Sequence, residues 1–228
     1  MRILLIGHGK MGRLVEHLAS AHDGEIAAIV DDGAHLARGI ADAGPIDVAI
    51  DFTEPRAVAG TVDALAAHRI NVVIGTTGWE EDEPRLRVVA ATAGIGVLAA
   101  ANFSIGMTIF RAIAEEAARK FRALDDVGAW LHEAHHAAKK DAPSGTAVML
   151  KAAMVDAGYN RPIDVSSTRA GSIPGTHTIG FDAAAETVTL THTVRDRATF
   201  AHGALTAAQW VQGKRGWFTM RDVLGLAK

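Results

Sequence analysis

Residues 2–12 read RILLIGHGKMG, and this stretch decides the fold of the first half of the chain. Its first five residues are typical of a short buried strand, and glycines 7, 9 and 12 fit the pattern G-x-G-x-x-G directly after it. The first glycine permits a tight turn, the second lets a diphosphate approach the backbone, and the third lets the following helix pack against the strand. The helix N-terminus adds free N–H groups, and Lys10 and Arg13 add positive charge. We expect a dinucleotide-binding loop here, with an ordinary glycine-rich turn as the alternative.

Apolar runs alternate with Ala-rich amphipathic stretches through residues 1–101. The expected strands are Arg2–Ile6, Glu25–Asp31, Ile46–Phe52, Asn71–Gly75 and Gly96–Ala100, and the expected helices are Met11–Ala21, Pro55–His68 and Glu80–Ala93. Nearly continuous apolar strands separated by helices predict a parallel sheet that is covered on both faces. The predicted fold class is therefore α/β, with a Rossmann-type doubly wound parallel sheet.

The pattern changes after Asn102 and predicts a smaller α+β domain with a mixed or open sheet. The expected helices of this domain are Ile105–Phe121 and Asp141–Gly158, and its expected strands are Val127–Glu133, His177–Phe181 and Thr187–Val194. A last expected helix, Thr199–Gln212, returns to the first domain. The last strand alternates strictly, as expected of a sheet with one exposed face or one face against a partner. We expect a dinucleotide-binding domain of residues 1–103 and 198–228, and a second domain of residues 104–197.

The composition excludes several classes of protein. The chain has 228 residues, no Cys, a net charge of -3 and 49% hydrophobic residues. Without Cys there is no disulfide framework, thiolate metal site or Cys nucleophile. The charge balance gives no basic footprint for nucleic acid, and no apolar run approaches the ~20 residues of a membrane span. We expect a cytoplasmic protein that binds neither nucleic acid nor membrane.

Asp31 and Asp32 stand at the end of the second expected strand, and Asp31 is nineteen residues beyond Gly12. An acidic residue at this point accepts hydrogen bonds from an adenosine ribose and repels a 2′-phosphate. No Arg or Lys adjoins the pair, and the nearest is Arg38. The two residues favour NADH over NADPH, and two solvated turn carboxylates are the alternative.

His132, Glu133 and His136 spell H-E-x-x-H, the signature of zinc proteases. That motif binds zinc only on a helix, where positions i and i+4 share one face. Here the preceding residues 127–131 predict a strand, and the longer form of the motif is absent because positions 139 and 142 are Lys and Ala. We therefore expect no metal ion.

A second interpretation of the same segment is a site for an anionic substrate. His135, His136, Lys139 and Lys140 form a cationic cluster after a strand, and residues 141–146, DAPSGT, predict a helix start with Pro in its first turn. Hydroxyl and N–H groups at such a helix end suit a carboxylate, and a His can donate a proton near neutral pH. A solvated basic loop is the alternative.

Residues 133–147 contain the pattern E-x-H-H-x-x-K-x-D-A-P-S-G-T-A in full. On this pattern the chain resembles the 4-hydroxy-tetrahydrodipicolinate reductase family of the lysine and diaminopimelate pathway. Further family motifs follow the same order: residues 7–12, 51–53, 75–78, 101–104, 169–171, 175–177 and 197–204. The resemblance covers essentially the whole chain.

The resemblance implies hydride transfer from a nicotinamide cofactor to a cyclic unsaturated dicarboxylate, giving tetrahydrodipicolinate. By analogy His135 is the proton donor and Lys139 the second catalytic residue. The implied substrate-binding residues are His136, Lys139, Ser144, Gly145, Thr146 and Arg197. The implied cofactor-binding residues are Gly7, Gly9, Lys10, Met11, Gly12, Asp31, Gly75, Thr76, Thr77, Ala101, Asn102, Phe103 and Ser104. Family members are usually homotetramers assembled through the sheet of the second domain.

One departure from the family concerns the cofactor. Many relatives carry a basic residue where this chain has Asp32, which supports NADH as the preferred cofactor and leaves NADPH as an alternative. Two other functions share the glycine loop. A non-catalytic NAD(H)-binding redox sensor would need no His/Lys cluster, and a dehydrogenase such as aspartate dehydrogenase would not predict the run from Lys139 to Thr146.

Overall fold

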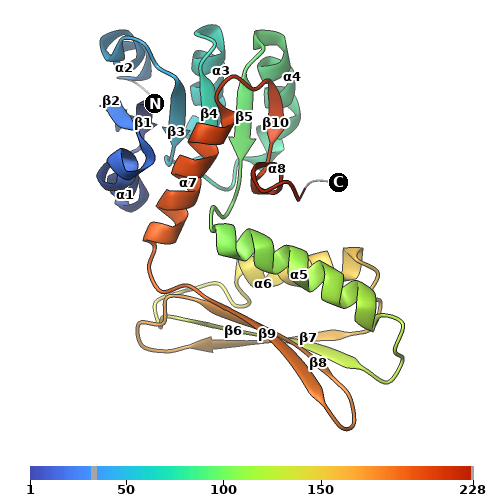
Figure 1. Ribbon diagram of the computed structural model, residues 1–228. Coiled ribbons are helices and arrows are strands. Elements are labelled where there is room, and N and C mark those ends of the chain that lie inside the picture. Colours follow the sequence, from blue (N-terminus) through green and yellow to red (C-terminus); the bar gives the residue numbers. More distant parts are fainter. Residues whose placement is uncertain (32–34, 227–228) are drawn as a thin grey trace. The chain divides into compact units, whose positions relative to one another are not determined.

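The computed structural model describes residues 1–31 and 35–226 (Figure 1). Their contacts divide the chain into two compact units, Met1–Ile105 with Ala198–Lys228, and Gly106–Arg197. Each unit has its own sheet and its own apolar core. Among the described residues, no helix is both long enough and apolar enough to cross a membrane.

The first unit is built on a six-stranded sheet in the order β10-β5-β4-β3-β1-β2, with every pair parallel. The strands are β1 (Arg2–Ile6), β2 (Glu25–Val30), β3 (Val48–Asp51), β4 (Asn71–Ile74), β5 (Gly96–Ala99) and β10 (Gly216–Phe218). Strand β1 lies between β2 and β3, so the chain reverses its direction of travel across the sheet at this point. Such a switch point is where doubly wound folds bind ligands, at the carboxyl ends of the strands.

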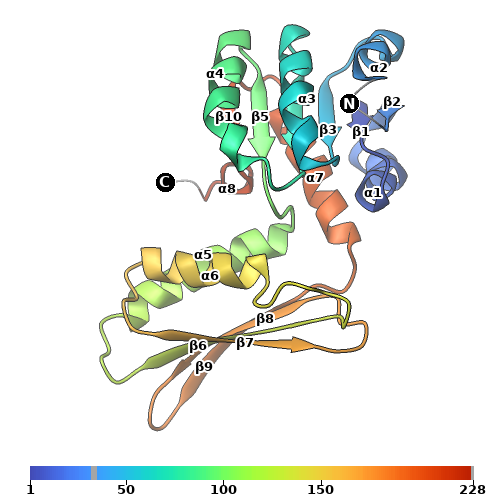
Figure 2. The same cartoon turned by 180° about the vertical axis from the view of Figure 1, so that it is seen from behind.

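Helices cover both faces of this sheet, which explains why its strands are apolar on both sides. One face packs against α2 (Leu36–Ala43), α3 (Pro55–Ala67) and α4 (Glu83–Ala93), which follows the short helix η3 (Glu80–Asp82). The other face packs against α1 (Lys10–Leu18), which continues into η1 (Ala19–His22), and against α7 (Ala198–Val211) and α8 (Met220–Val223). Figure 1 shows α7 in front of the sheet, and Figure 2 shows α3 and α4 in front of it from the opposite side. The predicted Rossmann-type α/β fold is confirmed.

The second unit contains a four-stranded sheet in the order β7-β6-β8-β9. Its strands are β6 (Gly128–His135), β7 (Ile163–Arg169), β8 (Thr176–Asp182) and β9 (Thr187–Thr193). Strand β6 is parallel to β7 and antiparallel to β8, so the sheet is mixed, as predicted. Helices α5 (Ile105–Phe121) and α6 (Gly145–Asp156) pack on one face over a core that includes Phe110, Leu131, Leu150 and Phe181 (Figure 2). No helix of the described residues covers the other face.

Two boundaries of secondary-structure elements near residues 133–147 differ from the prediction. Strand β6 continues to His135 instead of ending at Glu133, because Ala170 N–H extends its pairing to the His135 carbonyl. Helix α6 begins at Gly145 instead of Asp141, with the Ser144 hydroxyl accepting from Ala147 N–H as the N-cap. Pro143 therefore precedes the helix and does not lie in its first turn. The residue before a proline disfavours helical backbone, which agrees with this later start.

Candidate active site

The three glycines of residues 7–12 meet three different requirements. Gly7 has a φ of +88°, and its N–H donates to the Val30 carbonyl at 2.8 Å. A Cβ at Gly7 would lie 2.3 Å from the Phe52 carbonyl oxygen, and a Cβ at Gly12 would lie 2.1 Å from the Gly7 carbonyl oxygen. A Cβ at Gly9 would meet nothing within 4 Å. The loop thus needs Gly7 and Gly12 for its own packing, and the open side of Gly9 fits the approach of a diphosphate.

Asp31 lies directly after β2, beside this loop. Its Oδ1 accepts a hydrogen bond from His8 N–H at 3.0 Å, and the side chain is exposed. Arg38, the nearest Arg or Lys in the sequence, pairs with Asp42 on its own helix at 3.3 Å. Asp32, the second acidic residue of the prediction, lies outside the described residues.

Asp51 ties together the loops that follow β3 and β4. Its Oδ1 accepts from Thr53 N–H at 2.9 Å, from the Thr53 hydroxyl at 2.7 Å and from the Thr76 hydroxyl at 2.8 Å. Burial raises the pKa of the Asp51 carboxyl, and these hydrogen bonds act against that rise. The Phe52 ring lies where a Cβ on Gly75 would be, 2.0 Å from its Cε1, so Gly75 is required for this packing.

The other predicted cofactor residues also follow strands of the first sheet. Lys10, Met11 and Gly12 open α1 after β1, Gly75, Thr76 and Thr77 follow β4, and Ala101, Asn102, Phe103 and Ser104 follow β5. Carboxyl ends of parallel strands meet at one edge of a sheet. The structure therefore brings these predicted residues to one edge, and this edge has the glycine loop and acidic side chain that a dinucleotide requires.

In the second unit, the strand geometry of β6 separates the residues of the H-E-x-x-H pattern. Side chains alternate along a strand, so His132 lies on the face opposite Glu133. His132 makes its contacts with Ser166 at 2.9 Å and Thr168 at 3.5 Å on that other face. The arrangement that a zinc protease needs is absent from this segment.

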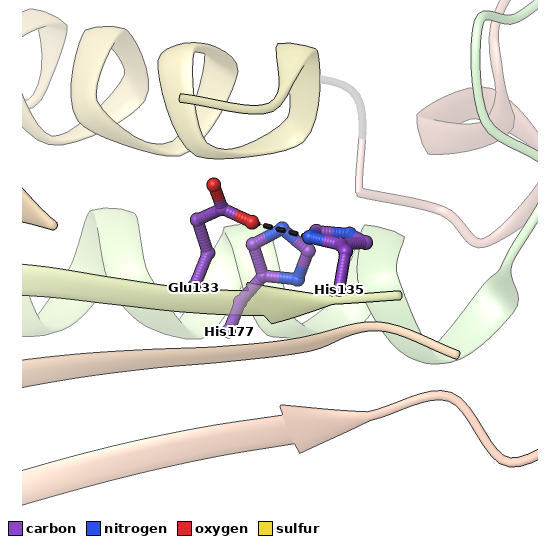
Figure 3. A group of neighbouring side chains, drawn as sticks. All are labelled: Glu133, His135 and His177. Carbon is purple, nitrogen blue, oxygen red and sulfur yellow. Dashed lines mark hydrogen bonds and ion pairs between the residues drawn. The ribbon is translucent and has the colours of Figure 1, made fainter. Parts of the chain in front are cut away.

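Glu133 and His135 share the helix-covered face of β6 and contact one another (Figure 3). The Glu133 side chain is 0% exposed, and Arg169 on β7 donates to both of its oxygens, at 2.7 Å to Oε1 and 3.0 Å to Oε2. His135 Nδ1 lies within hydrogen-bond distance of Glu133 Oε2. The strand register explains the cluster, because Arg169 is paired with His135 and His177 is paired with Glu133.

His177 connects this cluster to the start of α6. Its Nε2 lies 3.2 Å from the Ser144 hydroxyl, and its ring meets the His135 ring edge to face at 5.2 Å between centroids. Burial and the neighbouring His135 together lower the pKa of His177 to about 4, so the ring is neutral at neutral pH. Ser144 N–H donates to Glu133 Oε1 at 3.3 Å. The N-terminus of α6 is thereby fixed against β6.

The remaining predicted site residues of the second unit lie on loops or at the helix start. Lys139 Nζ pairs with Asp141 Oδ1 at 2.7 Å, and Asp141 is half exposed. His136 follows β6 directly, and Gly145 and Thr146 form the first turn of α6, where backbone N–H groups have no carbonyl of the helix to bond. Arg197 lies in the exposed turn before α7.

Glu133, His135 and His177 have the spacing of a metal site, with one ligand atom from each within 4.8 Å of the others. The electrostatics do not fit an ion, because the Arg169 guanidinium already bonds both oxygens of Glu133. A cation would have to displace Arg169 from a buried carboxylate. Glu133, His135 and His177 are better explained as part of a hydrogen-bond cluster in which Glu133 is ion-paired with Arg169.

Sequence reasoning assigned no role to Glu133, Arg169 or His177, although all three lie in quoted motifs. Extending the alternation of β6 by two residues would have placed Glu133 and His135 on one face. The contribution of Arg169 and His177 depends on strand register, which one sequence does not reveal.

A parallel sheet with a glycine loop at its switch point, joined to a unit with a His/Lys cluster, defines the class of nicotinamide-dependent oxidoreductases. The sequence model "Dihydrodipicolinate reductase, N-terminus" matches residues 1–103, and "Dihydrodipicolinate reductase, C-terminus" matches residues 106–224. The chain therefore belongs to the dihydrodipicolinate reductase family, whose enzymes function in lysine and diaminopimelate biosynthesis.

Individual relatives agree with this assignment. The chain is 34% identical to 4-hydroxy-tetrahydrodipicolinate reductase of Christiangramia forsetii, over 98% of each chain. It is 38% identical to the enzyme of the same name from Alkalilimnicola ehrlichii, over 99% of each chain. A solved dipicolinate-bound dihydrodipicolinate reductase from Paenisporosarcina sp. TG-14 has the same fold, with a TM-score of 0.80 and 22% identity over 96% of this chain and 97% of that one.

Gly9→Ala and Gly12→Ala separate the two roles of the glycine loop. At Gly12 a Cβ collides with backbone, so we expect the free energy of unfolding to fall by about 2 kcal/mol. At Gly9 the Cβ has room, so we expect a stability change within about 1 kcal/mol and a roughly tenfold rise in the Kd for NADH. Chemical denaturation and fluorescence titration measure the two effects. Equal NADH binding by Gly9→Ala and wild-type protein would contradict the assigned phosphate contact.

Proposed function

We propose that this protein reduces 4-hydroxy-tetrahydrodipicolinate, or the dihydrodipicolinate formed from it by loss of water, to tetrahydrodipicolinate. The nicotinamide dinucleotide supplies the hydride for this reduction when it is bound. Residues 7–12, Asp31, residues 75–77 and residues 101–104 would hold that cofactor. The single observation that carries the proposal is the complete run from Glu133 to Ala147, which joins a buried acid/base cluster to a cationic loop and a helix N-terminus.

Each group of this run has a separate task in the proposed reaction. Reduction of a conjugated C=C–C=N system needs a proton at one atom as well as a hydride at another. His135 is the proton donor, since its Nε2 is the nitrogen not used by Glu133. A Cβ at Gly175 would lie 3.2 Å from this Nε2, so the glycine leaves space beside it. Lys139 provides positive charge for the anionic substrate. Holding the substrate in one orientation lowers the activation barrier of the reaction.

The substrate carboxylates would be bound at the start of α6. Gly145 and Thr146 offer N–H groups of the first turn, and the positive end of the helix dipole favours an anion there. His136, Lys139, Ser144 and Arg197 complete the proposed set of substrate contacts. A helix of twelve residues with a capped, fixed N-terminus supplies these groups already oriented.

A coupled assay tests the proposed reaction. Substrate generated from pyruvate and aspartate semialdehyde should cause oxidation of NADH or NADPH, followed by absorbance. His135→Ala and Lys139→Ala should lower kcat/KM by roughly 10²-fold or more, because the first removes the proposed proton donor and the second removes the positive charge that holds the anionic substrate in place. Thr146→Val should mainly raise KM, since it alters a substrate contact.

The outcomes distinguish a failure of the proposed reaction from a failure of the roles proposed for His135 and Lys139. A folded, cofactor-binding protein without substrate-dependent oxidation would disprove the reaction itself. Normal turnover in both the His135→Ala and Lys139→Ala variants would instead disprove the assigned roles and leave the reaction standing.

We propose NADH as the preferred cofactor, on the basis of the carboxylate of Asp31 beside the glycine loop. Asp31→Asn retains an oxygen for His8 N–H but removes the charge that repels a 2′-phosphate. We expect the ratio of kcat/KM for NADH to that for NADPH to exceed one in the wild type and to fall about tenfold in the variant. Comparable values for both cofactors in the wild type would overturn the preference and point to Lys10 or Arg13 as phosphate contacts.

We further propose a cytoplasmic homotetramer assembled through the second sheet. Support comes from the sheet face opposite α5 and α6, where Trp130, Thr178 and Thr191 lie and no described helix packs. Sedimentation should give about four times the chain mass of 23.9 kDa. Thr178→Lys should reduce this mass, because it buries a charge in the interface, whereas Val155→Lys on the exposed side of α6 should not. A wild-type mass of 23.9 kDa would rule out the assembly.

A further inference from the structure

The carboxylate of Glu133 is fully buried and is surrounded by hydrogen-bond donors from three segments. Arg169 donates to both oxygens, Ser144 N–H donates to Oε1, and His135 Nδ1 meets Oε2. Burial alone would raise the pKa of Glu133, but hydrogen bonds from Arg169, Ser167 and His135 together lower it to about 2. The group is therefore a permanent carboxylate throughout the range in which enzymes work.

An ionised carboxylate can only accept, so the His135 nitrogen that faces it must carry a proton. This fixes Nδ1–H as the donor in the neutral ring and leaves Nε2 as the nitrogen that gains or loses a proton. The ring is also fixed in orientation, because Nδ1 is bonded on one side and Gly175 lies beside Nε2 on the other. A proton donor needs this combination of one bonded and one titrating nitrogen.

Arg169 keeps Glu133 in the position that this arrangement requires. The two guanidinium nitrogens match the two carboxylate oxygens, a geometry that Lys cannot reproduce. Arg169 also donates to the Asp141 carbonyl and thereby connects the buried carboxylate to the loop that contains Lys139. One side chain thus links both proposed catalytic residues.

We propose that Glu133 and Arg169 are positioning residues for His135, which set its tautomer and orientation and sustain its basicity for proton donation. This inference rests on the proposed function, because it assumes that His135 is the proton donor. Glu133 and Arg169 act through His135 and touch neither substrate nor cofactor in this scheme. A buried ion pair is a weak source of stability, so a role in positioning accounts better for this one than a role in folding alone.

The charges around His135 show why a carboxylate is needed there. Burial lowers the pKa of His135, and the positive charges of Lys139 and Arg169 lower it further. Glu133 is the charged group that raises it, while the neighbouring His177 is neutral at neutral pH. Without Glu133, every remaining influence would favour the neutral imidazole, which is a much weaker acid than the imidazolium.

Glu133→Gln tests the proposal through the pH dependence of kcat/KM. Activity that requires the protonated His135 falls as the pH rises through its pKa. The variant loses the charge that raises this pKa, so the midpoint of the fall should move to lower pH by about one unit or more. At neutral pH kcat/KM should drop roughly 100-fold, with an unchanged Kd for NADH. An unchanged midpoint and rate would overturn the proposal.

Glu116→Gln is the matched control, because it makes the same chemical change in a carboxylate paired with Arg119 on the exposed side of α5. Its rate and pH profile should equal those of the wild type. Arg169→Lys keeps the charge but loses the paired contact, so we expect a smaller loss, about tenfold, and restored activity relative to Arg169→Ala. Equal activity of Arg169→Ala and wild type would remove Arg169 from the proposal.

A spectroscopic measurement decides the tautomer without any assay of activity. In ¹⁵N-histidine-labelled wild-type protein, the signals of His135 are those that disappear in His135→Asn. Above its pKa, the ring should carry its proton on Nδ1, and a proton on Nε2 would overturn the proposal. If the wild type fails to oxidise NADH or NADPH with substrate, the proposed function fails, while this spectrum still reports on the Glu133 contact.

Discussion

The second unit depends on one buried charge, the carboxylate of Glu133. An isolated carboxylate in an apolar interior is too costly to keep, so its neighbours must supply a countercharge and enough donors. Arg169, His135 and Ser144 N–H provide them from three separate segments, β7, β6 and the start of α6. The same contacts that make the charge tolerable fix the helix N-terminus and orient a titratable ring. The hydrogen bonds that stabilise the buried Glu133 carboxylate therefore also position the groups around it.

In the first unit, the conformation of the backbone in the glycine loop sets the shape of the proposed cofactor site. Gly7 and Gly12 allow carbonyl groups to approach where any side chain would collide, and Gly9 leaves one side of the loop open. Asp51 then joins the loops after β3 and β4 by accepting from Thr53 and Thr76. A diphosphate is bound mainly by backbone N–H groups, so this unit needs exact loop shape more than reactive side chains.

The apolar pattern predicted the inner strands of the first sheet well because β1, β3, β4 and β5 are buried on both faces. Strand β1 matches its prediction at both ends, and β2 to β5 match within two residues. Strand β7 was not predicted, since only Ile163 and Val165 are apolar in its sequence. Ser167 and Arg169, its later positions on the helix-covered face, lie beside Glu133 and His135 and are polar. The alternation of apolar and polar residues that predicts a strand is therefore lost at the candidate site. Helix α2 was missed for another reason: Gly39 interrupts it, and the glycine is needed because a Cβ would lie 2.2 Å from Val30 Cγ2.

The motifs indicated candidate site residues but not how these residues contact one another. His135, Lys139 and Ser144 are close in sequence, whereas Arg169 and His177 reach Glu133 only through the pairing of β6 with β7 and β8. A slip of one residue in that pairing would move Arg169 to the opposite face and leave Glu133 without its countercharge. The cost of an unpaired buried carboxylate therefore disfavours the wrong register. In this sheet the ion pair that orients the proposed proton donor also helps to specify the fold that contains it.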